Sequence, residues 1–159
     1  MSDLNPYEGF LDGRPVEEIL HATANEIASL LAKIGVEKSA VRPAPGKWSA
    51  AEIVSHLADC ELVFGFRLRQ TLAEDHHVIQ PFDQDKWAAT YRGIGAGEAL
   101  GVFGSVRRWN LRLIHDALPA AAGRSVTHPE RGTMTFQTIV ETMAGHDLNH
   151  LAQLQRLSV

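Results

Sequence analysis

Disulfide bonds within the chain are excluded, because its 159 residues contain a single cysteine, Cys60. Small secreted domains commonly depend on several disulfides. The first six residues, Met1 to Pro6, also lack the basic stretch followed by an apolar stretch that is typical of a signal peptide. We therefore expect a cytoplasmic protein.

Long apolar runs are absent too, since none approaches the ~20 residues that a membrane-spanning helix needs. Positive charge is scarce: 15 Lys and Arg against 19 Asp and Glu give a net charge of −4 with histidines neutral. A surface that neutralises phosphates is thus not expected, which argues against general nucleic-acid binding. With 45% hydrophobic and 21% charged residues, the composition is that of one folded domain, expected to span residues 1–159.

Four segments carry apolar residues at spacings of three and four, the pattern that predicts amphipathic helices. The second segment starts with a capping box, in which Ser49 is followed three residues later by Glu52. Thr135 is placed to cap the last segment. The predicted helices span residues 15–33, 50–74, 98–117 and 136–157.

Proline and glycine interrupt the chain between these helices. We expect an ordered arm at residues 1–13, loops at 39–48 and 75–82, and a short helix at 83–89. Residues 126–135 predict a small β-hairpin that turns at Glu130 to Gly132. Four long helices with two long connections predict an all-α helix bundle, a fold that often holds metals between facing helices.

Three of the eight histidines lie on the apolar stripes of predicted helices. His146 and His150 stand four residues apart, so their rings leave one helix face about one turn apart. His56 lies on or beside the core face of the second helix. Each could be a buried residue bonded to a polar neighbour, but together the three predict a shared divalent metal ion. The zinc-protease pattern His-Glu-x-x-His is not met, because Asp147 takes the second place.

Three imidazoles suit zinc, nickel, iron or cobalt. They leave coordination positions open for water or substrate, as catalytic zinc sites do. Such a site can activate water for hydrolysis or bind a thiol as thiolate. The residue pattern alone does not choose between these reactions.

Residues near the histidines are weaker candidates. Asp59 or Glu61 could accept a hydrogen bond from a ligand histidine, and the spacing does not choose between them. Cys60, one turn after His56, could face the same ion, although a small buried apolar residue is the preferred interpretation. His128 in the hairpin could reach a cleft, with an ordinary loop residue as the preferred interpretation.

Other charged residues are expected at the surface. Arg107, Arg108 and Arg112 form a basic patch on the third long helix, which we expect to face solvent or a second subunit. Surface positions are also expected for His21, His76, His77 and His115.

Taken in order, these motifs resemble the DinB/YfiT-like superfamily. The resemblance covers about residues 40–157 and is carried by Pro45 to Ser49 with Glu52, His56 to Asp59, Leu72 to Asp75, Pro81 to Asp83 with Trp87 and Ala88, His128 to Gly132, and His146 to Gln153. It implies a four-helix bundle with up-down-down-up order and long crossover connections. It also implies a divalent metal on His56, His146 and His150, and a homodimer.

Members of that superfamily include thiol S-transferases that use bacillithiol or mycothiol, a mycothiol-dependent isomerase, and proteins labelled metal-dependent hydrolases. We therefore expect an enzyme that acts on a small molecule, as a thiol-dependent S-transferase or a hydrolase. Its expected cofactors are zinc, nickel or iron, with a low-molecular-weight thiol in the transferase. The alternatives are a stress-linked bundle whose metal is not catalytic, and a dimerising bundle without a metal. No nucleic-acid or membrane partner is expected.

Overall fold

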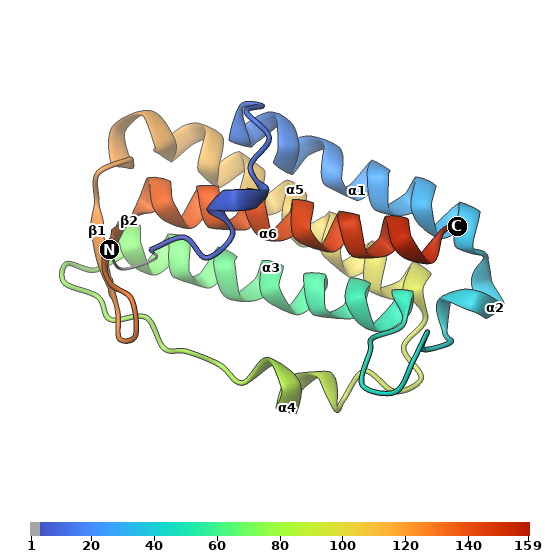
Figure 1. Ribbon diagram of the computed structural model, residues 1–159. Helices are drawn as coiled ribbons and strands as arrows, with labels where there is room; N and C mark the ends of the chain where they lie inside the picture. Colours follow the sequence, from blue (N-terminus) through green and yellow to red (C-terminus); the bar gives the residue numbers. More distant parts are fainter. Residues whose placement is uncertain (1–3) are drawn as a thin grey trace.

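The computed structural model describes residues 4–159 and shows four long helices packed as a bundle (Figure 1). The first three residues of the expected arm lie outside this described part. The long helices are α1 (Val16–Ile34), α3 (Ala50–Ala73), α5 (Ala96–Ala121) and α6 (Phe136–Leu157). The short elements are the 3-10 turn η1 (Glu8–Phe10), helices α2 (Val36–Ser39) and α4 (Gln84–Ala88), and strands β1 (Ser125–His128) and β2 (Gly132–Thr135).

The long helices run up, down, down and up in chain order (Figure 1). Helices α1 and α6 point one way and pack together, while α3 and α5 point the other way and pack together. Because α3 and α5 are parallel, the chain between them must return along the bundle, and it carries α4 on the way. The expected four-helix bundle, its order and its crossover connection are therefore confirmed.

Side-chain caps determine where α3 and α6 begin. The Ser49 side chain accepts a hydrogen bond from the backbone N–H of Glu52, whose carboxylate accepts one from the backbone N–H of Ser49 at 2.8 Å. Thr135 likewise accepts a hydrogen bond from the backbone N–H of Thr138 at 3.1 Å. These bonds satisfy amides that have no partner in the first turn of a helix. The two helices that carry the candidate histidines thus start where the sequence predicts.

Strands β1 and β2 form the expected antiparallel hairpin, with Val126 opposite Met134. The hairpin also contacts the crossover that follows α3. The backbone N–H of Ile79 donates to the carbonyl of Thr127 at 2.8 Å, and the N–H of Thr127 donates to the carbonyl of His77 at 2.9 Å. The hairpin therefore ties the crossover to the start of α6.

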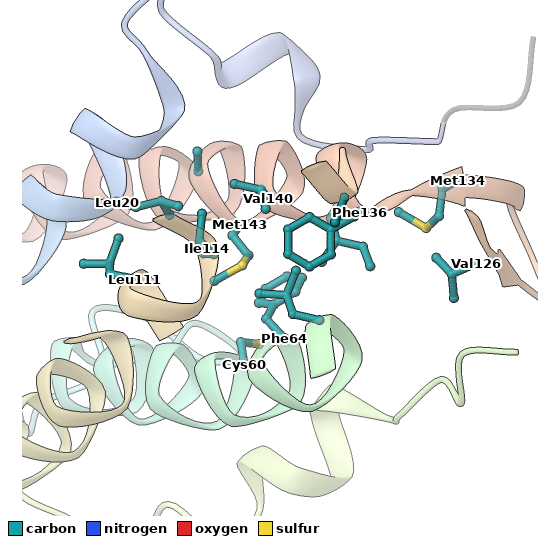
Figure 2. Packing of buried hydrophobic residues seen from close by; sticks show 14 of the residues in the cluster. Leu20, Cys60, Phe64, Leu111, Ile114, Val126, Met134, Phe136, Val140 and Met143 are labelled. Atoms are coloured by element: carbon teal, nitrogen blue, oxygen red, sulfur yellow. The ribbon is translucent and has the colours of Figure 1, made fainter. Parts of the chain in front are cut away.

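The hydrophobic core forms two clusters along the bundle. The cluster nearer the hairpin includes Leu20, Phe64, Ile114, Phe136 and Met143 (Figure 2). The second cluster includes Ile27, Leu57, Phe103, Leu151 and Leu154. Between these clusters each long helix contributes a buried polar side chain, and we call these four residues the polar layer: Thr23, Glu61, Arg107 and Asp147.

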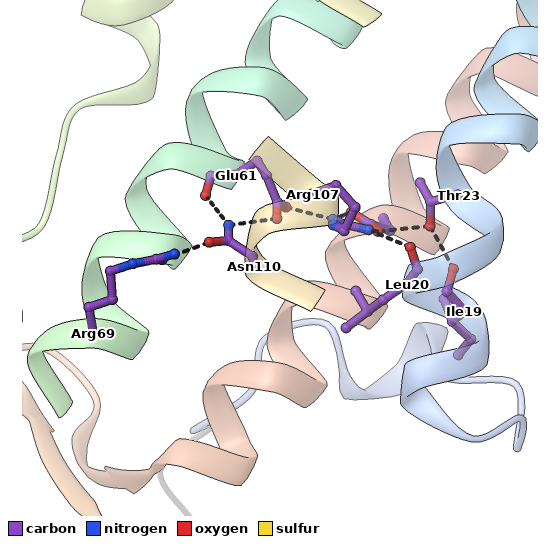
Figure 3. A network of polar contacts seen from close by, with 8 residues as sticks. Ile19, Leu20, Thr23, Glu61, Arg69, Arg107 and Asn110 are labelled. Carbon is purple, nitrogen blue, oxygen red and sulfur yellow. Dashed lines mark hydrogen bonds and ion pairs between the residues drawn. The ribbon is translucent and has the colours of Figure 1, made fainter. Parts of the chain in front are cut away.

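Arg107 lies at the centre of the polar layer and is 2% exposed (Figure 3). Its Nη1 donates to Asp147 Oδ2 at 2.6 Å and to the carbonyl of Leu20 at 3.0 Å, and its Nη2 donates to Glu61 Oε2 at 2.7 Å. Thr23 Oγ1 lies 2.8 Å from Asp147 Oδ2. One guanidinium thus joins groups from α1, α3 and α6 to α5.

The prediction that Arg107 belongs to a solvent-facing basic patch is wrong, although Arg108 and Arg112 are exposed as expected. Arg107 lies four residues after Phe103 and four before Leu111, both of which are buried, so it shares their inward face. Helix α5 is also longer than expected at both ends and continues through Pro119. No helix within residues 4–159 is long and apolar enough to cross a membrane.

Candidate metal centre

The structure brings the three predicted histidines together at the contact between α3 and α6. His146 Nε2 lies 3.1 Å from His56 Nε2 and 3.1 Å from His150 Nε2. One ring nitrogen from each residue lies within 4.8 Å of the other two, and all three side chains are buried. Two antiparallel helices therefore present three ring nitrogens to one point.

Hydrogen bonds among the rings cannot satisfy all three nitrogens. A nitrogen of a neutral imidazole either carries a proton or offers a lone pair, so His146 Nε2 cannot donate to one neighbour and accept from the other. A divalent ion accepts a lone pair from each. Bonds of about 2.0–2.1 Å to a tetrahedral metal place its ligands about 3.3 Å apart, close to the observed spacing of 3.1 Å. The residues present therefore fit a divalent metal ion.

Burial keeps the three rings neutral. It lowers the pKa of His56 to about 3, with the charge of His150 as a smaller cause. Burial also lowers the pKa of His146 well below its ordinary value, and the neighbouring His150 and His56 lower it further. For His150 burial again lowers the pKa, against a hydrogen bond with Gln153 that raises it. Neutral imidazole is the form that binds a metal, so no proton has to leave these rings near pH 7.

Gln153 orients one of the rings. Its Oε1 lies 3.0 Å from Nδ1 of His150. Because an amide oxygen only accepts, Nδ1 carries the proton, and Nε2 of His150 offers its lone pair toward His146. Such contacts fix the direction of a ligand ring and often affect metal affinity strongly.

Asp59 and Glu61, the residues predicted for this role, have other partners. Asp59 accepts a hydrogen bond from the Tyr91 hydroxyl at 2.7 Å. Glu61 accepts from Arg107 at 2.7 Å and from Asn110 at 2.8 Å. Within residues 4–159, neither carboxylate has a hydrogen bond to the three histidines. Glu61, five positions after His56, lies on another face of α3, while the carboxylate of Asp59, three positions after His56, is taken by Tyr91.

Aromatic rings pack against the histidine cluster. The Trp48 ring lies 4.8 Å from the His56 ring, centroid to centroid. Tyr7 and Phe64 meet the His146 ring edge-on at 5.1 and 5.9 Å. These contacts limit the access of water to the rings and leave one open side.

The open side is a cleft of about 190 Å³ lined by His56 and His146 but not by His150. Its other walls come from the arm, the crossover and the hairpin, and include Tyr7, Phe82 and His128. Two larger cavities, of about 540 and 510 Å³, are lined by none of the three histidines. The donor atoms, rather than the volume, therefore identify this cleft as the candidate site. His128 lines this cleft, so the first of the two interpretations of its position is correct, and the preferred one, an ordinary loop residue, is not.

Cys60 lies at the edge of the site. Its Sγ is 3.4 Å from Nε2 of His56, and the residue lines the same cleft. Burial raises the pKa of its thiol above the ordinary value, and the charge of Asp59 raises it further. Cys60 also packs within the hydrophobic cluster nearer the hairpin (Figure 2). It is therefore a protonated, largely apolar neighbour of the histidines, in line with the preferred interpretation.

Tyr7 is a site residue that the sequence did not reveal. The arm lies along α6, and the backbone carbonyl of Tyr7 packs against Gly145 (Figure 1). A Cβ at position 145 would lie 2.4 Å from that carbonyl oxygen, closer than atoms can approach. The available signal was a glycine inside an otherwise regular helical pattern, which often marks a close approach of another chain segment.

Sequence comparisons agree on one group of proteins. The chain is 27% identical over 113 residues to a protein of Oceanobacillus iheyensis named "Putative metal-dependent hydrolase", a match that covers 70% of this chain and 66% of that relative. A protein of Geobacillus thermodenitrificans with the same name is 27% identical over 117 residues, covering 70% of this chain and 65% of its own length. The chain thus spans just under two thirds of the length of these relatives.

Among solved structures, the fold is similar to that of YfiT from Bacillus subtilis, described as "a probable metal-dependent hydrolase with an unusual four-helix bundle topology". The TM-score is 0.83 at 18% sequence identity, over 90% of this chain and 83% of YfiT. The sequence model of the DinB superfamily matches residues 19–154, which include all of α3 and α5, most of α1 and α6, and the three histidines. The chain therefore belongs to the DinB superfamily.

Proposed function

We propose that this protein is a metal-dependent enzyme acting on a small molecule, and that His56, His146 and His150 bind its divalent ion. The observation that carries the proposal is the convergence of three neutral ring nitrogens, with two 3.1 Å spacings, at the wall of a cleft. The names of the curated relatives support it. Three protein ligands also leave coordination positions open, as catalytic sites require.

A bound divalent ion would supply Lewis acidity to a substrate atom in the cleft. The chain's own residues set the conditions for that chemistry. Gln153 holds the proton of His150 on Nδ1, so that Nε2 stays available. Trp48 packs against the His56 ring, and Phe64 packs against the His146 ring at the wall of the cleft.

Hydrolysis is the reaction that the relatives' names favour. Thiol transfer is the second candidate, and Cys60 bears on it. Because burial raises the pKa of Cys60, its thiol is protonated beside the histidines in the metal-free chain. A transferase built on this site would therefore take its thiolate from a low-molecular-weight thiol. Zinc, nickel and iron all suit three imidazoles.

Elemental analysis of the purified protein tests the metal site. We expect near-stoichiometric zinc, nickel or iron, and we expect His146→Ala to lose it. His21→Ala is the matched control, because His21 is an exposed histidine on α1 and should leave the metal content unchanged. A wild-type protein that purifies without metal and takes none up when metal is added would refute the site. A His146→Ala variant that keeps its metal would also refute it.

Cobalt-substituted protein then separates the reactions. Turnover of small ester or amide probes without a response of the cobalt spectrum to thiols indicates the hydrolase. Thiol coordination, followed by transfer to an electrophile, indicates the transferase. A loaded protein that does neither would support the alternative, a bundle whose metal is not catalytic.

We also propose a homodimer. Its support is a set of large apolar side chains exposed on α3 and α5: Leu62, Phe66, Val102 and Trp109. Trp109 is 69% exposed, although burying such a ring would be favourable. Light scattering should report twice the chain mass, and Trp109→Asp should shift it toward the monomer. A wild-type protein that is monomeric at all concentrations would exclude this proposal.

A further inference from the structure

Two arginines line the same cleft as the candidate metal ligands His56 and His146. Arg67 comes from α3, and Arg131 comes from the turn between β1 and β2. The Arg67 guanidinium carbon lies 6.0 Å from the ring centroids of both Phe64 and Phe82. Rings on two sides restrict its position, so the guanidinium is held in the cleft and not extended into solvent.

The positive charge of the two arginines is not neutralised by the described chain. Within residues 4–159, no carboxylate lies within ion-pair distance of Arg67 or Arg131. The buried Arg107 differs, because Glu61 and Asp147 both pair with it. Among the described residues, the Arg67 side chain has one hydrogen bond, from Nη2 to the carbonyl of Gln80 at 3.3 Å, and its buried Nε has no partner. Donor capacity and charge thus remain available at the cleft.

His128 adds a third donor to this wall. Its Nδ1 accepts a hydrogen bond from the backbone N–H of Glu130 at 3.2 Å, so in the neutral ring the proton sits on Nε2. Burial lowers the pKa of His128, and the charges of Arg131 and Arg67 lower it further, against a smaller opposite effect of Glu130. The charges of both arginines therefore reach the same part of the cleft, where His128 lies. Glu130 also lines the cleft but is exposed.

We propose that Arg67 and Arg131 bind an anionic group of the substrate, a carboxylate or a phosphate, while the reacting end of the same molecule lies at the metal centre. This inference rests on the proposed function. A divalent ion on three neutral histidines would add two further positive charges to the cleft, which strengthens its attraction for anions. Guanidinium groups bind carboxylate and phosphate oxygens with paired, charge-assisted hydrogen bonds.

The size of the cleft limits the substrate to a short molecule. A sphere of about 190 Å³ is about 7 Å across, well below the 300–1,000 Å³ of pockets for drug-sized ligands. Pro81 and Phe82 supply apolar contact for a few carbon atoms between the two ends. The expected substrate class is therefore a small anion with a short carbon chain.

Matched thiol probes test this subsite on cobalt-loaded protein. 3-Mercaptopropionate carries a carboxylate, 2-mercaptoethyl phosphate carries a phosphate, and 3-mercapto-1-propanol carries neither. Isothermal titration calorimetry of the loaded protein reports the affinity for each probe, independent of turnover and of whether the thiol coordinates the cobalt. We expect an anionic probe to bind about tenfold or more tightly than the alcohol, as expected for charge-assisted hydrogen bonds. Whichever anionic probe shows the larger preference identifies the group.

Arg67→Gln and Arg131→Gln should each reduce that preference toward parity and leave the affinity for the alcohol unchanged. Arg108→Gln is the control, because it removes the same charge from the exposed face of α5. Circular dichroism establishes that each variant is folded. Equal affinity for charged and uncharged probes, or a preference that persists in both cleft variants, overturns the proposal. A protein that takes up no cobalt is a separate outcome, and it overturns the proposed function together with this inference.

Discussion

Arg107 offers a sharp test of how the bundle is held together. Replacing it with Met keeps a side chain of similar length but leaves Glu61 and Asp147, 1% and 2% exposed, without their cation. Removing one partner of a buried ion pair costs about 3–5 kcal/mol, because the remaining charge stays desolvated. Domains of this kind are stable by only about 5–15 kcal/mol. The substitution should therefore remove a large fraction of the free energy of unfolding.

Urea unfolding followed by circular dichroism measures this loss. With a denaturant dependence of about 1–3 kcal/mol/M, the midpoint for Arg107→Met should fall by at least about 1 M urea. Arg112→Met is the matched control on the same helix, since the Arg112 side chain is 79% exposed where it pairs with Asp116. Pairs of that kind contribute about 0–1 kcal/mol. The control should unfold close to the wild type.

A combined variant separates lost charge pairing from lost packing. Glu61→Gln and Asp147→Asn, added to Arg107→Met, remove both unpaired carboxylates and retain side chains of nearly the same size. The triple variant should recover part of the lost stability, because no buried charge then lacks a partner. A loss below about 1 kcal/mol in Arg107→Met would refute the reasoning. So would a triple variant that is less stable than the single one.

Two further predictions follow from the site. Gly145→Ala should displace the arm, because the new Cβ would lie 2.4 Å from the Tyr7 carbonyl oxygen. Limited proteolysis should then cut near residues 5–10 faster than in the wild type. The control is Gly101→Ala, whose Cβ would meet nothing within 4 Å and which should leave the rate of cleavage unchanged. In the metal-free protein, the pKa of His56 is about 3 in the folded state against an ordinary value of 6.5, so folding favours the neutral ring. The contribution of this preference to the stability of the fold is complete above pH 6.5. That contribution should fall by up to about 1.4 kcal/mol per pH unit between these values, and His56→Gln should flatten this part of the stability curve; an unchanged curve would contradict the burial argument.

The fold was largely predictable, because its main elements carry strong local signals. Capping residues at Ser49 and Thr135 placed the starts of α3 and α6, and helix α6 ends where its apolar stripe ends. The single turn of α2 was missed, since four residues are too few to show a helical period. Helix α5 was expected to stop before Pro119, because a proline lacks the N–H that would bond to the carbonyl four residues earlier, but the helix continues through Pro119 to Ala121.

Only those residues of the candidate site that share the inward face of a long helix could be predicted from the sequence. The spacing of His146 and His150 indicated a shared face, and the stripe containing His56 indicated where the third ring would lie. The cleft walls gave no such signal, because they come from an arm, a crossover and a hairpin that meet only in three dimensions. Arg107 was misassigned because its neighbours in sequence are surface arginines, while its partners are distant along the chain.

The polar layer has a consequence for the vertical register of the helices. Apolar side chains are interchangeable over one helical turn, so two hydrophobic clusters alone would tolerate a slip of about 5.4 Å between helices. A slipped α6 would move Asp147 away from Arg107 and against apolar side chains, leaving both charges unpaired. Asp147 directly follows His146 in the chain, and Glu61 lies on α3 with His56. The ion pairs that exclude the slipped alignments therefore also fix the height at which histidines from two different helices meet.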